Sequence, residues 1–399
     1  MGLDFTPALP RSAWIEVDLT ALRHNFVSIR SHVPDSTELL YVAKDDAYGL
    51  GAVTAARVAL SSGATRLAVF TLEEARTLRH AGITAPILLF GERLKEELPW
   101  VLSLDLEPCL GRVEIARAFN ELARSQGRLI SVHLKINTGM NRFGFSWRTV
   151  TDWGPQLAVL RELDFAGAMT HFAQSDELDK TVARSQIQRF QNCVNQLRQN
   201  GLTPRCLHQC NSGGVLDLPE AHLDIVRVGL LAHGIYPSLV CGRLPDLRPV
   251  MTVKARVVAI QTLVPGDTVG YGMRWRAERP SRIGVLPLGY GDGFPRLRNE
   301  GHALIQGTRA PLVGGVTMDA LMVDLTDLPL VEVGEEAVLM GRQGAEEITA
   351  QDLALLKRSV SYDLLTGWRQ RLPRVYLGSY FHGTFKSVYN DDYSSQGEE

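Results

Sequence analysis

The stretch 41-YVAKDDAYGLGAV-53 decides the fold, because it contains the unit from which the first 230 residues are built. An apolar run typical of a buried strand ends in Lys44, and a loop of small residues carrying Tyr48 follows. A single lysine in such a place is most often a solvated loop residue. The surrounding sequence therefore has to distinguish that interpretation from a lysine placed for chemistry.

Apolar, β-branched runs of the same kind recur between residues 14 and about 230. They are WIEVDL, LLYVAK, RLAVF, APILLF, LEPCL, LISVHLKI, FAGAMTHF, PRCLHQC and HLDIVRVG. Residues 72–82 and 182–201, which lie between such runs, have helical spacing and end in glycine. Apolar strands separated by helices indicate a parallel sheet covered on both faces. Eight or nine such units favour an α/β fold of the (β/α)8 TIM-barrel type, although periodicity alone also allows a doubly wound sheet.

The pattern changes after Pro237. Short β-type runs bounded by Pro, Gly and Asp follow, with no helical pattern before about residue 349. Such runs predict a mostly-β C-terminal domain. We place the barrel at residues 13–243, the β-rich domain at 244–385 with residues 1–12 packed against it, and a polar tail at 386–399.

Composition excludes several classes of protein. The net charge of −2 and the scattered Lys and Arg residues give no reason to expect nucleic acid or a membrane as partner. The five cysteines are an odd number and widely spaced, which predicts reduced thiols rather than disulfides or a zinc site. We find no signal-peptide pattern and no run of 18 apolar residues, so we expect a cytoplasmic protein.

Polar side chains follow several apolar runs, at the strand ends where a barrel carries its active site. They are Lys44; Lys135 with Asn137 and Arg142; His171; Asn211 with Ser212; and Arg227 with Gly229. No cluster suits a metal, and 210-CNSGG-214 is not a serine-nucleophile elbow. A lysine at a strand end suits a Schiff base, and backbone N–H groups at 211–214 and 228–230 suit a phosphate. Together with an arginine for a ring nitrogen, these features meet the requirements of pyridoxal 5'-phosphate (PLP).

Motifs along nearly the whole chain, from about residue 13 to 378, resemble those of the alanine racemase family of fold-type III PLP enzymes. They are WIEVDLTALRHNF (14–26), VAKDDAYGLG (42–51), LKINTGMNRFGF (134–145), THFAQSDE (170–177), HQCNSGG (208–214), RVGLLAHGIYPS (227–238), VGYGMRW (269–275), PLGYGDGFPR (287–296), VGGVTMDALMVDLTD (313–327) and LPRVY (372–376). Several motifs in one order are far more specific than any one of them alone.

The resemblance implies a racemase that interconverts L-alanine and D-alanine by a two-base mechanism and supplies D-alanine for peptidoglycan. Lys44 would hold PLP and act as one base, and Tyr271, from the partner subunit of a homodimer with shared active sites, as the other. The remaining roles implied are phosphate and backbone contacts for Tyr48, Asn211, Ser212, Gly229 and Leu230; the ring nitrogen for Arg227; the ring for His171; the phenolic oxygen and substrate for Arg142; substrate contacts for Met318 and Asp319; and a possible carbamate on Lys135. No metal is implied.

Six positions depart from the family pattern without removing a catalytic group: Asp45, Leu50, Asn137, His233, Thr317 and Gln370. They affect the expected phosphate contacts and substrate range. One alternative is therefore a serine or broad-specificity racemase on the same scaffold. Another is a PLP-binding protein without turnover, although a complete β domain with Tyr271 argues against it.

Overall fold

The computed structural model describes residues 9–378, which form two compact units. One unit is Leu22–Arg248, and the other combines the described residues up to Ala21 with those from Pro249 onward. The chain therefore starts in the second unit, builds the first, and returns to the second.

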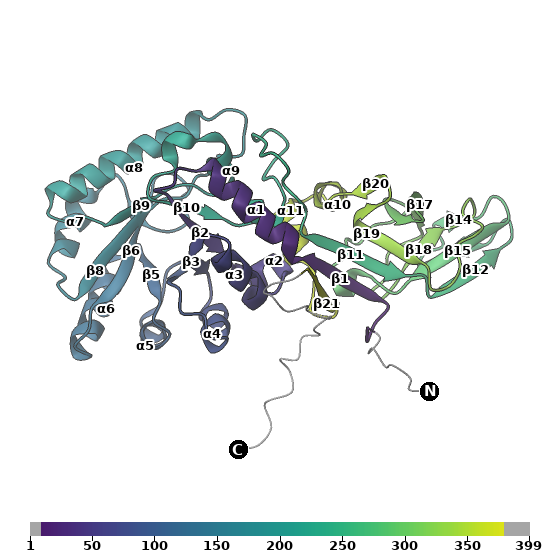
Figure 1. Cartoon of the computed structure of the whole chain (residues 1–399), viewed down its shortest axis with the longest axis horizontal. Coiled ribbons are helices and arrows are strands. Elements are labelled where there is room, and N and C mark those ends of the chain that lie inside the picture. The colour runs from purple at the N-terminus through teal and green to yellow at the C-terminus, as the bar shows by residue number, and fades with distance from the viewer. Residues whose placement is uncertain (1–8, 379–399) are drawn as a thin grey trace, which may run out of the picture. The chain divides into compact units, whose positions relative to one another are not determined.

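The Leu22–Arg248 unit is a nearly closed barrel of parallel strands in the order β10-β2-β3-β4-β5-β6-β8-β9 (Figure 1). Backbone hydrogen bonds of 3.1 Å from Asp224 to Leu207 and from Arg227 to Cys210 join the two ends of this order. The predicted barrel is confirmed, and the doubly wound sheet is excluded. The strands are β2 (Glu38–Val42), β3 (Ala64–Val69), β4 (Ile87–Leu89), β5 (Glu107–Leu110), β6 (Ile130–Asn137), β8 (Leu163–Met169), β9 (Cys206–His208) and β10 (Ile225–Val228), with β7 (Phe145–Ser146) beside β6.

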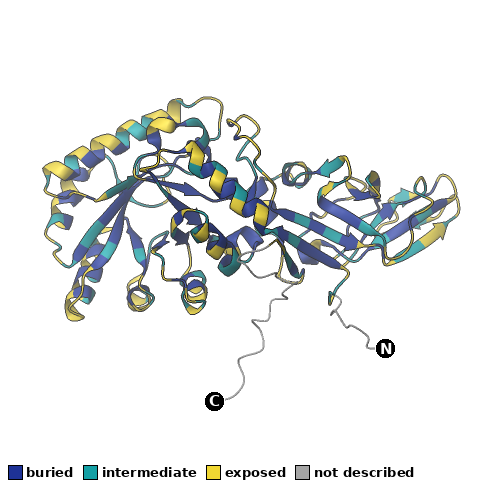
Figure 2. Ribbon diagram, viewed as in Figure 1, coloured by how far each residue is buried: buried dark blue, intermediate teal, exposed yellow. Residues whose placement is uncertain are grey.

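Helices lie outside the barrel strands, and most of them expose their outer faces (Figure 2). They are α1 (Leu19–His32, which begins in the other unit), α3 (Ala52–Ser61), α4 (Leu72–His80), α5 (Leu98–Ser103), α6 (Val113–Ser125), α7 (Val150–Ala158), α8 (Thr181–Gln199) and α9 (Ser212–Asp217). The helices predicted at 72–82 and 182–201 are confirmed as α4 and α8. Thr71 and Glu74 begin α4 with a reciprocal capping box, and Gly82, at φ 78°, follows its end.

The barrel strands are buried on both faces, as their continuous apolar runs predict. Leu39, Leu40 and Tyr41 are successive residues of β2 and are all fully buried. Burying one leucine side chain contributes about 1.5–3 kcal/mol, so the interior of the barrel supplies much of its stability.

The second unit is mostly β, as predicted. Its main sheet has the order β12-β15-β18-β17-β16-β19-β11-β1-β21, with β20 beside β19 and a separate β13–β14 pair. Its elements are β1 (Ala13–Asp18), β11 (Met251–Arg256), β12 (Ala259–Leu263), β13 (Thr268–Val269), β14 (Trp275–Arg276), β15 (Ser281–Leu286), β16 (His302–Ile305), β17 (Thr308–Val313), β18 (Leu321–Asp324), β19 (Glu336–Gln343), β20 (Glu346–Ile348), β21 (Arg374–Leu377), α10 (Ala350–Leu356) and α11 (Ser361–Thr366).

The boundary predicted at residue 13 is wrong. The run WIEVDL forms β1, which pairs with β11 and β21 of the β domain rather than with a barrel strand. An apolar run specifies a buried strand but not its partner, because pairing depends on residues more than 200 positions away. Arg11 bonds Asp292 in the same domain, consistent with the packing predicted for the described residues before β1. The predicted tail at 386–399 lies outside the described residues.

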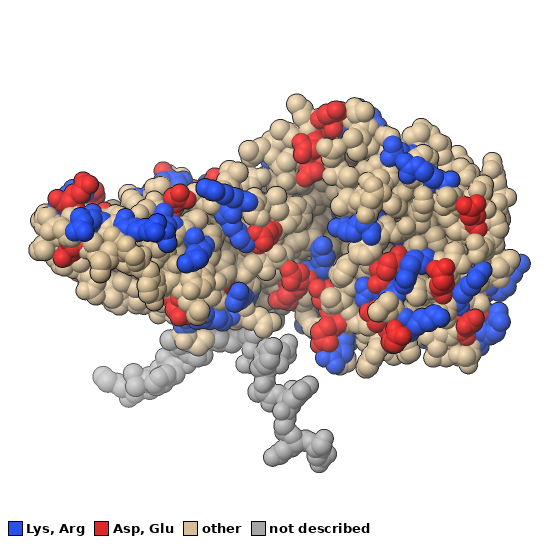
Figure 3. Space-filling view, turned by 180° about the vertical axis from the view of Figure 1, so that it is seen from behind, with Lys and Arg blue, Asp and Glu red and all other residues tan. Residues whose placement is uncertain are grey.

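Neither the surface charge nor the hydropathy of the helices distinguishes the two units. Acidic and basic side chains are interspersed over the face in Figure 3. Within residues 9–378, no helix is long and apolar enough to cross a membrane.

Candidate active site

Lys44 lies two residues after the last residue of β2 and begins the short element α2 (Lys44–Gly49), which is a left-handed turn. Residues 45–48 all have φ between 51° and 53°. Left-handed backbone costs a residue with a side chain about 1–2 kcal/mol, and Asp and Asn tolerate it best. Asp45, where alanine is usual in the resembled family, therefore suits its backbone conformation. Strain of this kind is typical of functional sites.

Hydrogen bonds hold this turn from two sides. The Asp45 N–H donates to the Glu74 carboxylate at 2.7 Å, and the Asp46 carboxylate accepts the Ala52 N–H at 2.7 Å. Glu74 also accepts the N–H of Thr71 at the start of α4. One carboxylate thus ties the loop after β2 to the loop after β3, which fixes the backbone around Lys44.

The turn packs Tyr48 against the loop after β10. A Cβ atom on Gly229 would lie 2.7 Å from the Tyr48 hydroxyl, so only glycine fits there. The Ser212 hydroxyl accepts the N–H groups of Gly229 and Leu231, both at 3.3 Å. Two hydroxyls and a closely approachable backbone around Leu230 form a small polar cradle, which suits a phosphate.

Asn211 has a supporting place beside this cradle. Its side-chain oxygen accepts the Gly214 N–H at 3.0 Å and the Ser175 hydroxyl at 2.7 Å. Asn211 therefore caps α9 and orients Ser212, the next residue.

Arg227, on β10, is 2% exposed and has no carboxylate partner within residues 9–378. Its guanidinium donates to the carbonyls of Thr170 and Gln209, both at 2.9 Å. It also donates to Nδ1 of His208 at 3.1 Å and approaches Nδ1 of His171 at 3.3 Å. Burial lowers the pKa of Arg227 to about 10, so the group keeps its charge at neutral pH.

Cations gather around His171. Burial and the charges of Lys135, Arg227, Arg142 and Lys44 hold its pKa well below the ordinary value, so the ring is neutral. Burial and the Arg142 charge also lower the pKa of Lys44. A lysine with a lowered pKa carries more of the neutral amine, which is the nucleophilic form.

Lys135, near the end of β6, lies among the same charges. Burial and the Arg227 charge lower its pKa to about 7. Within the described chain, no ion pair includes Lys44, Lys135, Arg142 or Arg227. Asn137 orders the loop that carries Arg142, since its side chain accepts the N–H groups of Gly139 and Asn141 at 3.1 Å and 3.0 Å.

These residues fit PLP. The excess of positive charge favours an anionic ligand, and the cradle at Gly229 leaves backbone open where a side chain would block it. The side-chain oxygen of Gln209, which follows β9, is buried and has no hydrogen-bond partner among the described residues.

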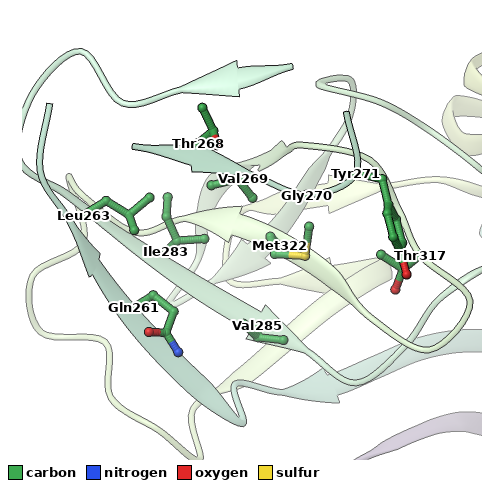
Figure 4. A pocket seen from close by; sticks show the side chains of 10 residues that line it. All are labelled: Gln261, Leu263, Thr268, Val269, Gly270, Tyr271, Ile283, Val285, Thr317 and Met322. Atoms are coloured by element: carbon green, nitrogen blue, oxygen red, sulfur yellow. The ribbon is translucent and has the colours of Figure 1, made fainter. Parts of the chain in front are cut away.

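Tyr271 lies on the β domain, in the turn between β13 and β14. It stands between Gly270 and Gly272, which both have positive φ, and is 80% exposed. The residue lines one end of a pocket of about 520 Å³, beside Thr317 (Figure 4). The pocket walls are mainly apolar, including Val269, Ile283, Val285 and Met322.

Met318 and Asp319 lie in a turn that the 289-GYGDG-293 motif supports. The N–H groups of Tyr290 and Gly291 donate to the carbonyls of Thr317 and Met318 at 2.9 Å and 2.8 Å. A Cβ atom on Gly289 would lie 2.2 Å from the Thr317 carbonyl oxygen. The glycines thus allow close backbone packing of this turn. Thr317 closes the turn itself, because its hydroxyl bonds the Ala320 carbonyl at 2.8 Å.

The structure brings together Lys44, Tyr48, Lys135, Arg142, His171, Ser212, Arg227 and Gly229 in the barrel, and Tyr271, Met318 and Asp319 in the β domain. Two residues of this site have no role in the sequence-based predictions: His208, which bonds Arg227, and Glu74, which holds the turn. His208 begins the motif HQCNSGG (208–214), and its place at the end of an apolar run is the sequence feature that could have indicated a site residue.

A lysine among unpaired cations at the carboxyl end of a barrel, in a chain with a separate β-rich domain, defines a barrel enzyme. Family models match both parts: "Alanine racemase, N-terminal domain" over residues 17–237 and "Alanine racemase, C-terminal domain" over residues 250–376. The chain belongs to the alanine racemase family.

Known racemases are similar to this protein over nearly its whole chain. An alanine racemase of Carboxydothermus hydrogenoformans is 40% identical over 92% of this chain and 100% of its own length. The solved alanine racemase of Clostridium difficile has a TM-score of 0.89 and 31% identity, covering 96% of this chain and 98% of its own. A histidine racemase from Leuconostoc mesenteroides has a TM-score of 0.85 and 31% identity, covering 93% and 99%.

Proposed function

We propose that this protein interconverts L-alanine and D-alanine with PLP, using Lys44 and the partner subunit's Tyr271 as two bases. The observation that best supports the proposal is that both family domains match this one chain. Both are needed, because Lys44 lies in the first domain and Tyr271 in the second. The reaction would take place in the cytoplasm, and the D-alanine that it forms would be used for peptidoglycan.

PLP, when bound, supplies the electron sink that makes the Cα proton of an amino acid removable. Lys44 would hold it, with the cradle of Tyr48, Ser212, Gly229 and Leu230 around its phosphate. Arg227 would face the ring nitrogen. With a pKa of about 10, Arg227 donates a hydrogen bond at neutral pH without giving up its proton.

Racemisation needs one base on each face of the substrate carbon. The lowered pKa of Lys44 supports a proton acceptor on one face. The phenol of Tyr271 would hold or accept the proton on the other. Met318 and Asp319, in the same domain as Tyr271, would line the substrate site, and Arg142 would contact both cofactor and substrate.

The exposure of Tyr271, at 80%, supports a homodimer with shared sites. Met273 and Met318 are also exposed, at 71% and 52%, as is Val264 at 63%. Exposed large apolar side chains on the domain that carries Tyr271 support a surface that another protein covers.

Lys135 is proposed to carry a carbamate. Its neutral amine would add CO2, forming a C–N bond and releasing one proton, and the resulting anion would pair with Arg142. The lowered pKa supports this step, since the neutral amine is the reactive form.

The test is detection of D-alanine from L-alanine with a coupled D-amino-acid oxidase, using purified protein with PLP. A panel including L-serine and L-histidine is run in parallel, because a histidine racemase shares this fold. Turnover of serine or histidine above that of alanine would favour the alternative substrate. Cofactor binding without any turnover would favour a non-catalytic PLP protein.

A further inference from the structure

A chain of hydrogen bonds runs through the barrel interior from Arg227 to a carboxylate. Arg227 lies 3.1 Å from Nδ1 of His208, and Nε2 of His208 lies 2.9 Å from Nδ1 of His133. Nε2 of His133 then lies 3.2 Å from the carboxylate of Glu107. Both imidazoles are fully buried. The four residues come from four different strands, so the closed barrel alone brings them together.

The barrel makes space for this chain at Gly167 on β8. A Cβ atom there would lie 2.3 Å from Nδ1 of His133. The two imidazole rings meet edge to face, with centroids 5.0 Å apart and planes at 81°. A side chain at position 167 would displace His133 and break the chain.

Glu107 ends the chain as an anion. Burial opposes its ionisation, but the hydrogen bond from His133 and the charge of Arg66 outweigh burial and hold its pKa below the ordinary value. Arg66 donates to the same carboxylate at 2.9 Å. Glu107 therefore accepts hydrogen bonds and donates none.

The two ends together fix both histidine tautomers. Arg227 can only donate, so His208 must accept at Nδ1 and carry its proton on Nε2. His133 then accepts at Nδ1 and donates from Nε2 to Glu107. A second proton on either ring would place a donor against a donor, so both rings stay neutral.

We propose that Glu107 is the remote counter-ion of Arg227, and that His133 and His208 are positioning residues that link the two charges as aligned neutral dipoles. The inference rests on the proposed function, in which Arg227 faces the cofactor ring nitrogen. The chain would hold Arg227 in place and charged while keeping a carboxylate away from that nitrogen. Linked hydrogen bonds in a low-dielectric interior polarise one another, which suits such a relay.

The test compares Glu107→Leu, which removes charge and acceptor, with Glu107→Gln, which keeps an acceptor. Asp164→Asn is the matched control, because Asp164 is a part-buried barrel carboxylate bonded to Ser131 and outside the chain. The full-length holoenzyme is labelled with ¹⁵N-histidine, and ring-nitrogen NMR reports the tautomers of His133 and His208.

We expect Nε2–H tautomers in wild type, Glu107→Gln and Asp164→Asn, and a mixture of tautomers in Glu107→Leu. Loss of a hydrogen bond to a charged group predicts a kcat about tenfold lower in Glu107→Leu, with KM within about twofold. If Glu107→Leu does not fold, His133→Asn interrupts the same chain. The ring-nitrogen signals of His208 then show whether its tautomer depends on that chain.

A proton on Nδ1 of either wild-type ring would overturn the proposal, as would unchanged His133 and His208 signals in a folded Glu107→Leu. Racemisation by wild type is measured separately. Wild type with the expected tautomers but no racemisation contradicts the proposed function and supports the chain, whereas active wild type with other tautomers contradicts the chain alone.

Discussion

The cofactor site of the barrel and the Tyr271 surface of the β domain are built in opposite ways. In the barrel, Tyr48 and Arg227 are 5% and 2% exposed, and hydrogen bonds or packing fix each group. On the β domain, Tyr271 is 80% exposed and Met318 is 52% exposed. The barrel site is part of a folded core, whereas the side chain of Tyr271 is exposed to solvent on the surface of its domain.

Mutations in the two regions should therefore have different effects on stability and activity. A change in the buried site disturbs packing, cofactor binding and stability together, because the same side chains do all three. A change at Tyr271 removes a functional group without removing core contacts.

Replacing Lys44 with alanine should abolish both activity and the visible absorbance of the bound cofactor. Loss of a group that is both attachment point and base predicts a fall in racemisation of at least about 10⁴-fold in both directions. The measurement is D-alanine and L-alanine formation with parallel spectra. Lys357→Ala, which alters a lysine paired with Asp363, is the control and should behave as wild type.

Replacing Tyr271 with phenylalanine should lower racemisation by about 10²–10⁴-fold, the usual loss for one acid–base group. Cofactor absorbance and the urea unfolding midpoint should stay as in wild type, because the exposed hydroxyl supports no core packing. Activity within a few-fold of wild type would refute the two-base assignment.

Mixing Lys44→Ala with Tyr271→Phe should restore activity if the sites are shared between subunits. Random exchange gives one half heterodimers, each with one intact site of two, so activity returns to about a quarter of wild type. The mixture is assayed after subunit exchange by dilution and reassociation. No recovery, with exchange verified by tagged subunits, would mean that both bases belong to one chain.

Carbamylation of Lys135 should increase with pH through about 7, the pKa at which its neutral amine becomes predominant. ¹³C NMR of protein in ¹³C-bicarbonate should show one carbamate signal that is absent in Lys135→Met. That variant should lose about tenfold in kcat/KM, as for one hydrogen bond to a charged group. A signal independent of pH from 6 to 8 would contradict the lowered pKa.

Replacing His233 with phenylalanine should have the smallest effect. Its Nε2 bonds the Tyr41 hydroxyl at 3.0 Å, but its buried Nδ1 has no partner among the described residues. The variant loses an unpaired buried atom, which offsets part of the cost of leaving the buried Tyr41 hydroxyl without its partner. The unfolding free energy at pH 7 should therefore fall by about 1 kcal/mol.

The pH dependence of this variant has a definite sign. Burial lowers the pKa of His233 to about 3 from 6.5, so the unfolded chain takes up a proton there first as pH falls. Wild type should therefore lose stability relative to His233→Phe as pH falls from 6.5 towards 3. Urea midpoints at pH 7 and pH 5 measure the difference, and a wild-type midpoint that does not fall relative to that of His233→Phe between pH 7 and pH 5 would contradict burial of a neutral ring.

Much of the barrel site was predictable, because the carboxyl ends of parallel strands meet at one end of a closed barrel. Lys44, His171 and Arg227 each follow an apolar run, and they do lie together. Glu107 and His133 were not predictable as partners of Arg227. They stand within or beside apolar runs, where a polar residue signals only burial or a strand edge.

The periodicity of the strands and helices, the strand-end positions of the polar groups and the family motifs can be read from the sequence alone, because they depend on neighbours within a few residues. The pairing of β1 with the β domain and the left-handed backbone at Asp45 become visible only in the folded chain. The same holds for the link from Glu107 to Arg227 through two histidines. The physical reason is that strand pairing, stored backbone strain and buried hydrogen-bond chains depend on contacts between distant segments, which local patterns do not encode.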